Sequence, residues 1–89
     1  MRQYFNVACR ARYVPDAKRA GRCLASDMFA EYSALSARKA VAEVLKHPDH
    51  LLMAVDYELL PFFWSGFVAE WAKEQREFRA RNLLLRRSL

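Results

Sequence analysis

Hydrophobic and polar residues alternate along the first part of the chain with the two-residue period of a β-strand. Between Tyr4 and Tyr13 the apolar positions are Phe5, Val7, Cys9, Ala11 and Tyr13, and the positions between them include Asn6, Arg10 and Arg12. Such alternation is typical of a strand with one buried face and one solvent face. We therefore predict a strand over residues 4–13 whose solvent face is basic.

The stretch from Val14 to Tyr32 supports two interpretations. Pro15 followed by Asp16 favours a turn, so residues 14–21 are predicted to be a connection. A second strand then follows over residues 22–32, with one face formed by Leu24, Met28, Ala30 and Tyr32. The alternative is a helix that begins after Pro15, because Ala17, Ala20, Leu24, Met28 and Tyr32 also recur at helical spacing. Since Gly21 inside a helix would cost about 1 kcal/mol relative to alanine, we favour the strand.

The second half of the chain predicts two helices and a third strand. Ser36 suits an N-cap and is followed by strong helix formers up to Lys46, with Pro48 ending the helix. Residues 51–59 alternate again, which predicts a strand. The last helix is predicted to start at Pro61 or at Ser65, with one stripe made of Phe67, Val68, Trp71, Gln75, Phe78 and Asn82. Residues 83–89 contain no helix breaker, so they either extend this helix or fray.

This order of elements predicts an α+β fold. Strand, strand, helix, strand and helix form a small two-layer ββαβα sandwich, in which a three-stranded, mainly antiparallel sheet carries two helices on one face. Residues 1–89 are expected to be a single domain, because a chain of 89 residues is near the lower size limit for one hydrophobic core.

Composition narrows the class of protein. Hydrophobic residues make up 54% of the chain, which is too many for a disordered protein and generous for so small a monomer, so a homodimer remains open. No run approaches the roughly 18 apolar residues of a membrane span, and the first residues do not resemble a signal peptide. We therefore expect a cytoplasmic protein that does not enter a membrane.

The formal net charge of +5 is unevenly distributed. Residues 1–22 and 61–89 are basic, whereas residues 23–60 carry an excess of acids. The first basic region contains a candidate patch made of Arg10, Arg12, Lys18, Arg19 and Arg22. A basic balance favours an acidic partner, but it does not choose between nucleic acid and an acidic protein.

No cluster of residues predicts a catalytic or metal site. Cys9 and Cys23 lack the spacing of a zinc motif and are expected to be buried, reduced thiols. His47 and His50 flank Pro48-Asp49, but a metal site needs a third or fourth ligand, and no other part of the chain has matching spacing. We therefore predict no catalytic residue, metal or cofactor. A metal-dependent enzyme at residues 47–50 is the least favoured function.

The tripeptide His47-Pro48-Asp49 resembles the signature of J-domain co-chaperones, which lies between two antiparallel helices and engages an Hsp70. A basic helix is predicted before it, as in that family. The preceding stretch lacks the Tyr-x-x-Leu-Gly opening of the family, and the alternating residues after the tripeptide do not match its long third helix. The chain is therefore not assigned to that family.

The aromatic residues of the last helix suggest a binding role. Four of them are the candidate partner-binding residues Phe63, Trp64, Phe67 and Trp71. Aromatic and arginine side chains are enriched at the energetic centres of protein interfaces. We therefore predict a small non-enzymatic protein-binding module. By type, it suits an accessory or inhibitor protein of a phage or mobile element, of which anti-CRISPR proteins are one example. The alternative is a small basic nucleic-acid-binding protein that uses the basic patch.

Overall fold

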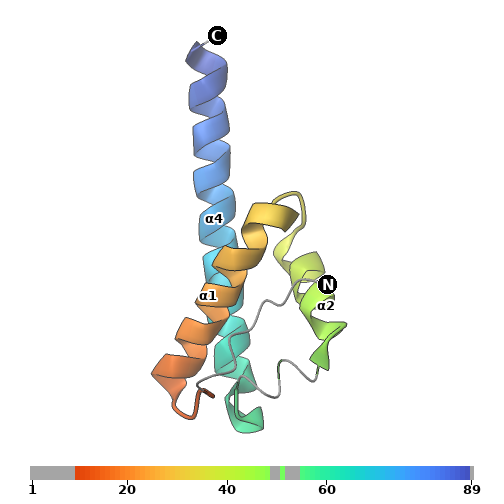
Figure 1. Cartoon of the computed structure of the whole chain (residues 1–89). Helices are drawn as coiled ribbons and strands as arrows, with labels where there is room; N and C mark the ends of the chain where they lie inside the picture. Colours follow the sequence, from red (N-terminus) through yellow and green to blue (C-terminus); the bar gives the residue numbers. More distant parts are fainter. Residues whose placement is uncertain (1–9, 49–50, 52–54, 89) are drawn as a thin grey trace.

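The computed structural model describes residues 10–48, 51 and 55–88, and within these residues the fold is helical. Helix α1 spans Val14–Tyr32, α2 spans Ala37–Leu45, the short 3-10 helix η1 spans Tyr57–Leu59 and α4 spans Leu60–Ser88. The only β-type pairing in the described part of the chain is an isolated parallel bridge between Ala11 and Val55. The predicted α+β sandwich is therefore wrong, and this part of the chain is a small helical domain (Figure 1).

The largest correction concerns residues 14–32, which form one helix in place of a connection and a strand. Pro15 lies in the first turn, where its missing N–H costs no hydrogen bond. The buried face of α1 has the periodicity of an amphipathic helix and consists of Ala17, Gly21, Leu24, Ala25, Met28 and Phe29. The helical alternative for this stretch is confirmed, and the strand is wrong.

Neither the first nor the third predicted strand is a strand in the described residues. Residues 4–9 of the predicted first strand lie outside the described residues, and residues 10–13 contribute only the Ala11 bridge. In the segment predicted as the third strand, Leu51 and Val55 are buried, and Tyr57–Leu59 is the 3-10 helix η1. The Asp56 N–H donates to the Ala11 carbonyl at 3.2 Å, and Arg10 Nε donates to Asp56 Oδ1 at 2.7 Å. Two segments far apart in sequence thus meet beside the core.

Both helices predicted in the second half are confirmed. The Ser36 side chain accepts a hydrogen bond from the Lys39 backbone N–H at 3.2 Å, so Ser36 is the N-cap of α2. Helix α4 begins at Leu60 with Pro61 in its first turn and continues through Ser88. The tail therefore extends the helix.

Helices α1 and α4 form the centre of the fold and run in the same direction (Figure 1). They approach so closely that a Cβ atom at Gly21 would overlap the Phe63 carbonyl oxygen, and one at Gly66 would overlap the Lys18 carbonyl oxygen. Further along the pair, the Phe29 ring contacts the Trp71 and Phe78 rings edge-on at 5.0 and 6.0 Å. The two helices differ in length: α1 has 19 residues and α4 has 29.

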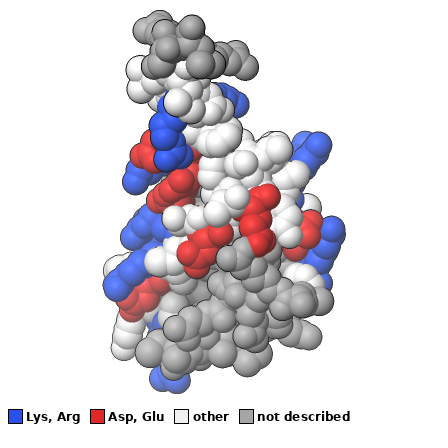
Figure 2. Space-filling view, turned by 45° about the horizontal axis from the view of Figure 1, so that its top comes forward, with Lys and Arg blue, Asp and Glu red and all other residues white. Residues whose placement is uncertain are grey.

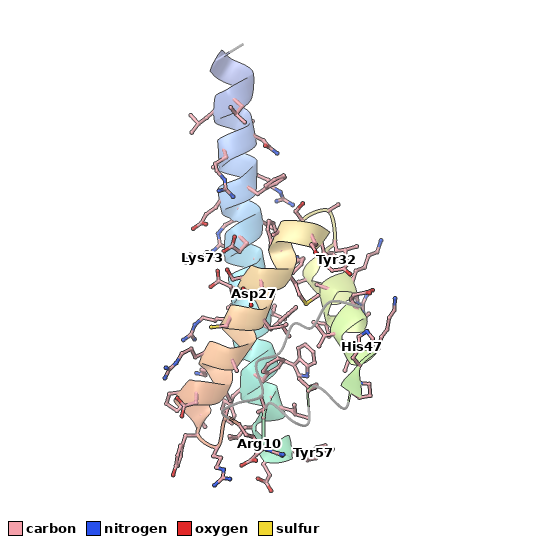
Figure 3. All side chains as sticks on the ribbon, in the orientation of Figure 1. Arg10, Asp27, Tyr32, His47, Tyr57 and Lys73 are labelled. Atoms are coloured by element: carbon pink, nitrogen blue, oxygen red, sulfur yellow. The ribbon has the colours of Figure 1, made fainter. Side chains whose placement is uncertain are left out.

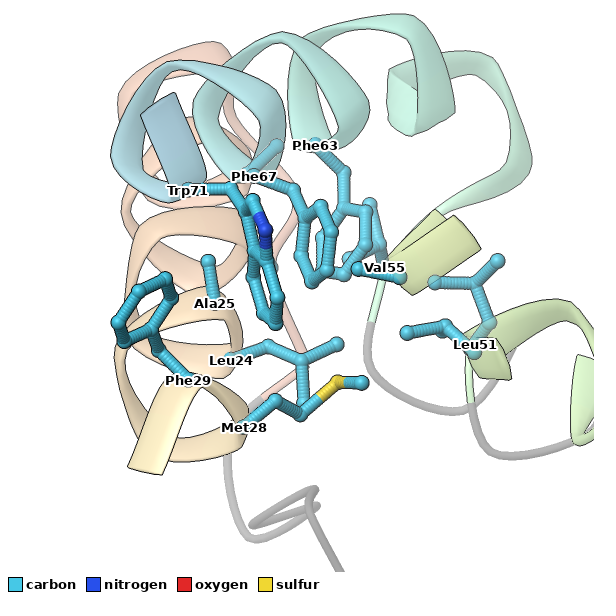
Figure 4. Packing of buried hydrophobic residues seen from close by; sticks show 13 residues of the cluster. Leu24, Ala25, Met28, Phe29, Leu51, Val55, Phe63, Phe67 and Trp71 are labelled. Carbon is cyan, nitrogen blue, oxygen red and sulfur yellow. The ribbon is translucent and has the colours of Figure 1, made fainter. Parts of the chain in front are cut away.

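The core is an aromatic and aliphatic cluster between α1, α4 and the segment around Val55 (Figure 4). Phe67 stacks on Trp71 with 5.7 Å between ring centroids. The Trp71 indole N–H donates to the Leu35 carbonyl at 2.9 Å, and Gln75 Nε2 donates to the same oxygen at 3.2 Å. These two bonds fix the α1–α2 connection against α4, and Ala40 and Val44 of α2 are buried in the same cluster.

Candidate protein-docking surface

Three of the four predicted partner-binding residues belong to the core. Phe63, Phe67 and Trp71 are completely buried, so they cannot contact a partner in this conformation. Trp64 is half-buried and packs edge-on against Phe63 and Phe67 at 5.1 and 5.5 Å. The structure therefore brings the four residues together, but as the packing face of α4. A surface that binds a partner must use other side chains.

The five residues of the predicted basic patch are all exposed. Lys18, Arg19 and Arg22 lie on α1, and not on a loop as predicted, while Arg10 and Arg12 precede the helix. Arg19 forms an ion pair with Asp16 at 2.8 Å, and Arg10 forms one with Asp56 at 2.7 Å. Two of the five charges are therefore already matched by carboxylates of the same chain.

The structure describes His47 and Cys23 but not His50 or Cys9. His47 lies after α2, as seen in Figure 3, and residues 49–50 lie outside the described residues. Among the described residues there is no group of three or more side chains that could hold a metal ion. Cys23 is a free thiol and is exposed on α1, which corrects the prediction that it is buried, whereas Cys9 lies outside the described residues.

The end of α4 carries exposed apolar side chains. Helix α4 continues past the end of α1 and projects from the domain (Figures 1 and 3). We call residues 79–88 the α4 overhang. All side chains from 76 to 85 are exposed, including Leu83, Leu84 and Leu85, whose exposed fractions are 58, 63 and 64%. Three adjacent leucines in water are unusual for a small domain and typical of a contact surface.

The overhang is also strongly basic. From Phe78 to Leu89 the sequence contains four arginines, at positions 79, 81, 86 and 87, and no acid. Arg79 and Arg81 are exposed. The sequence signal for this surface was the run of three leucines after a helix without a breaker. The exposure of these leucines could not be predicted, because it depends on how far α4 extends beyond the end of α1.

A groove lies where the overhang leaves the domain. It has a volume of about 300 Å³ and is formed between the end of α1 and the middle of α4. Its walls are Ser26, Phe29, Ala30, Ser33, Glu74, Phe78 and Arg81. Phe78 is 38% exposed and contacts Phe29, so the groove lining combines two aromatic rings with polar and charged side chains.

Glu74, which lines this groove, has two other carboxylates near it on α4. Desolvation raises the pKa of Glu74 above its ordinary value, and a hydrogen bond with Glu70 and repulsion from Glu70 and Glu77 raise it further. Lys73 opposes this effect only in part. In the view of Figure 2, some acidic side chains lie in the middle of the face, and others lie next to basic ones along its edges and beside the projecting helix. The groove lining itself holds one acidic side chain, Glu74, and one basic side chain, Arg81.

Comparisons of the chain with protein-family models, with curated proteins and with solved structures gave no match. No helix of the described residues is long and apolar enough to span a membrane. The expected cytoplasmic location stays a prediction.

Proposed function

We propose that this chain is a non-enzymatic protein-binding module, and that the α4 overhang is its contact surface. The observation that carries this proposal is the set of three exposed leucines, Leu83 to Leu85, on a projecting helix that also bears arginines. A helix that presents apolar side chains to a groove of another protein is a common mode of protein recognition. The arginines select a partner groove with an acidic rim, because opposite charges complement each other across an interface.

Nucleic acid explains the same surface less well. Phosphate binding uses the arginines but gives the leucines no role, since the nucleic-acid backbone is charged and hydrated. In the predicted basic patch, Arg10 and Arg19 are occupied by ion pairs with Asp56 and Asp16. Nucleic-acid binding through this patch stays a prediction. So does a role as an inhibitor from a phage or mobile element.

The test is site-specific photo-crosslinking of the full chain in the cells that express it. A photoreactive amino acid at Leu84 is compared with the same residue at Leu45, which is 50% exposed on α2. We expect protein adducts at position 84 and none at position 45. We also expect the adducts to disappear in Arg79→Glu/Arg81→Glu and to persist in Arg38→Glu/Lys39→Glu, which changes the charge equally on α2.

Equal adduct yields at positions 84 and 45 would contradict the proposal. Adducts at position 84 that are removed by nuclease would contradict it as well, and would favour the nucleic-acid alternative. Adducts that are insensitive to the Arg79→Glu/Arg81→Glu reversal would contradict the acidic character of the partner.

A further inference from the structure

One stripe of helix α4 packs against α1 and continues beyond the end of α1. The Trp71 and Phe78 rings both contact the Phe29 ring of α1 edge-on, at 5.0 and 6.0 Å. Trp71, Phe78 and Leu85 are spaced by seven residues, so they lie on one face of the continuous helix. Leu85 therefore carries the α1-facing stripe into the α4 overhang, where its side chain is 64% exposed.

The three exposed leucines are not equivalent around α4. At about 100° per residue, Leu85 lies about 20° from the direction of Phe78 around the helix axis. Leu83 and Leu84 lie about 140° and about 120° from that direction, on opposite sides of the helix. A partner that continues the cover provided by α1 therefore contacts Leu85 and leaves Leu83 in water.

The cover provided by α1 ends at the groove beside Phe78. This groove of about 300 Å³ lies between the end of α1 and the middle of α4. Phe78 lines it and remains 38% exposed although it contacts Phe29. Phe78 and Leu85 are about 10 Å apart along the helix at 1.5 Å per residue, so one element about two turns long can cover both side chains.

The positions between these two apolar residues have the pattern of a paired helix. Asn82 lies on the same stripe, four residues after Phe78 and three before Leu85. This is the heptad spacing of a coiled-coil seam, in which a single asparagine fixes the register of two helices. Arg79 and Arg81 occupy the positions that flank the seam, and both side chains are exposed. The stripe therefore suits a second helix better than a flat protein surface.

The charge of the flanking positions defines the partner helix. In paired helices these positions form the ion pairs that select one partner over another. In this chain they are arginines, and no acid occurs from Phe78 to Leu89. Two overhangs side by side would place arginine against arginine, so the pattern disfavours a second copy and favours a helix with carboxylates beside its seam.

We propose that the contact element of the partner is an acidic amphipathic helix, which packs on Phe78, Asn82 and Leu85 beyond the end of α1. This inference rests on the proposed function, since it names the contact element of the partner at the same surface. The partner helix places its apolar stripe on Phe78 and Leu85 and its carboxylates beside Arg79 and Arg81. It covers the overhang as α1 covers the preceding part of α4.

The test is fluorescence anisotropy of a labelled probe peptide titrated with the full chain. The probe is an amphipathic helix about three heptads long, with leucine at the seam positions and glutamate at the flanking positions, whose repulsion keeps it from pairing with itself. A matched probe carries lysine in place of each glutamate. We expect the wild type to bind the acidic probe with a dissociation constant of about 10–100 µM, as suits a small contact, and the basic probe at least about tenfold more weakly.

Two leucine variants of the chain locate the contact. Leu85→Gln should weaken binding of the acidic probe at least about tenfold, because it removes an apolar side chain from the stripe. Leu83→Gln removes the same side chain, with a similar exposed fraction, from another side of α4 and should change binding less than about twofold. Circular dichroism of both variants checks that the helices are retained.

Two charge variants test the ion pairs. Arg79→Glu/Arg81→Glu should lose the acidic probe and bind the basic probe in its place, because the charges beside the seam are then reversed. Arg38→Glu/Lys39→Glu, which makes the same change of charge on α2, should keep the wild-type preference for the acidic probe.

The inference is overturned if the acidic probe does not bind, if both probes bind equally, or if Leu85→Gln and Leu83→Gln have equal effects. Self-association of the wild type that Leu85→Gln abolishes, measured by analytical ultracentrifugation, would also overturn it, since a second copy would then be the occupant. If the inference fails while Leu84 still crosslinks to a protein in cells, the overhang remains a contact surface and the proposed function stands. If Leu84 forms no adducts in cells, the proposed function fails, whatever the probes do.

Discussion

Gly21 of α1 and Gly66 of α4 lie at one helix crossing, and each faces the backbone of the opposite helix. A Cβ atom at Gly21 would lie 2.8 Å from the Phe67 backbone nitrogen and closer still to the Phe63 carbonyl oxygen. A Cβ atom at Gly66 would overlap the carbonyl group of Lys18. The chain has only these two glycines, and both serve this contact between α1 and α4.

Replacing either glycine by alanine is therefore expected to destabilise the fold. Helix propensity alone would make Gly21→Ala or Gly66→Ala stabilising by about 1 kcal/mol. The overlap with backbone atoms, which cannot rotate away, forces the helices apart, and overpacking of this kind costs about 1–3 kcal/mol. Urea unfolding measures the difference. A rise in the free energy of unfolding for either variant would show that the helices are less closely packed than described.

The Leu35 carbonyl ties the α1–α2 connection to α4 through two side chains, Trp71 and Gln75. Trp71→Phe removes one donor and some core volume, and we expect a loss of about 1–3 kcal/mol. Because Gln75 still satisfies the carbonyl in that variant, Trp71→Phe/Gln75→Ala should cost more than the sum of the single changes. A double-mutant cycle by thermal or urea unfolding measures this coupling. Strict additivity would show that the two donors act independently.

The pKa of Glu74, raised by desolvation and by Glu70 and Glu77, links stability to pH. Its pKa is higher in the folded state than in the unfolded state, so ionised Glu74 disfavours folding, and this cost disappears as pH falls through the raised pKa. Glu74→Gln should therefore stabilise the fold at neutral pH. The advantage should vanish below the ordinary pKa of glutamate, about 4.3.

Unfolding measured across this pH range, with Glu58→Gln as a control for loss of one charge on η1, tests the link. A Glu74→Gln effect that is the same at neutral and acidic pH would show that crowding of carboxylates is not its cause.

Some of this architecture could be predicted from the sequence. Ser36 and the helix formers after it gave the N-cap and α2, and Pro61 marked the start of α4. The helix at residues 14–32 was considered but not preferred, because Gly21 counts against a helix when only propensity is considered. Gly21 is required because the α1 backbone lies against the backbone of Phe63 and Phe67, more than 40 positions away. Local sequence patterns carry no information about such a contact. The alternation over residues 51–59 also misled, because among the described residues of this stretch Leu51 and Val55 are buried while Tyr57–Leu59 forms the 3-10 helix η1.

The candidate site was harder to predict for a related reason. Phe63, Phe67 and Trp71 share an (i, i+4) stripe, and a stripe of large apolar residues is the usual core face of a helix. Choosing them by residue type selected the core. The exposed leucines follow from the difference in length between α1 and α4, which becomes apparent only when both helices are known to start at the same end of the molecule.

Weak nucleic-acid binding is expected if the basic residues are mainly surface charges. Binding of purified protein to labelled duplex DNA, single-stranded DNA and RNA should be lost at moderate salt. Submicromolar binding near physiological salt would contradict this, as would a linear fall of log affinity with log salt that becomes shallower in Arg10→Ala/Arg12→Ala. That result would favour the basic patch over the α4 overhang as the binding surface.

The central claim, that the α4 overhang is a contact surface for a protein partner, is tested most directly by photo-crosslinking of the full chain in the cells that express it, with the photoreactive residue at Leu84. We predict protein adducts at this position, and we predict that Arg79→Glu/Arg81→Glu removes them, because the arginines complement an acidic partner. No adduct at Leu84, or an equal yield at Leu45 on α2, would contradict the claim.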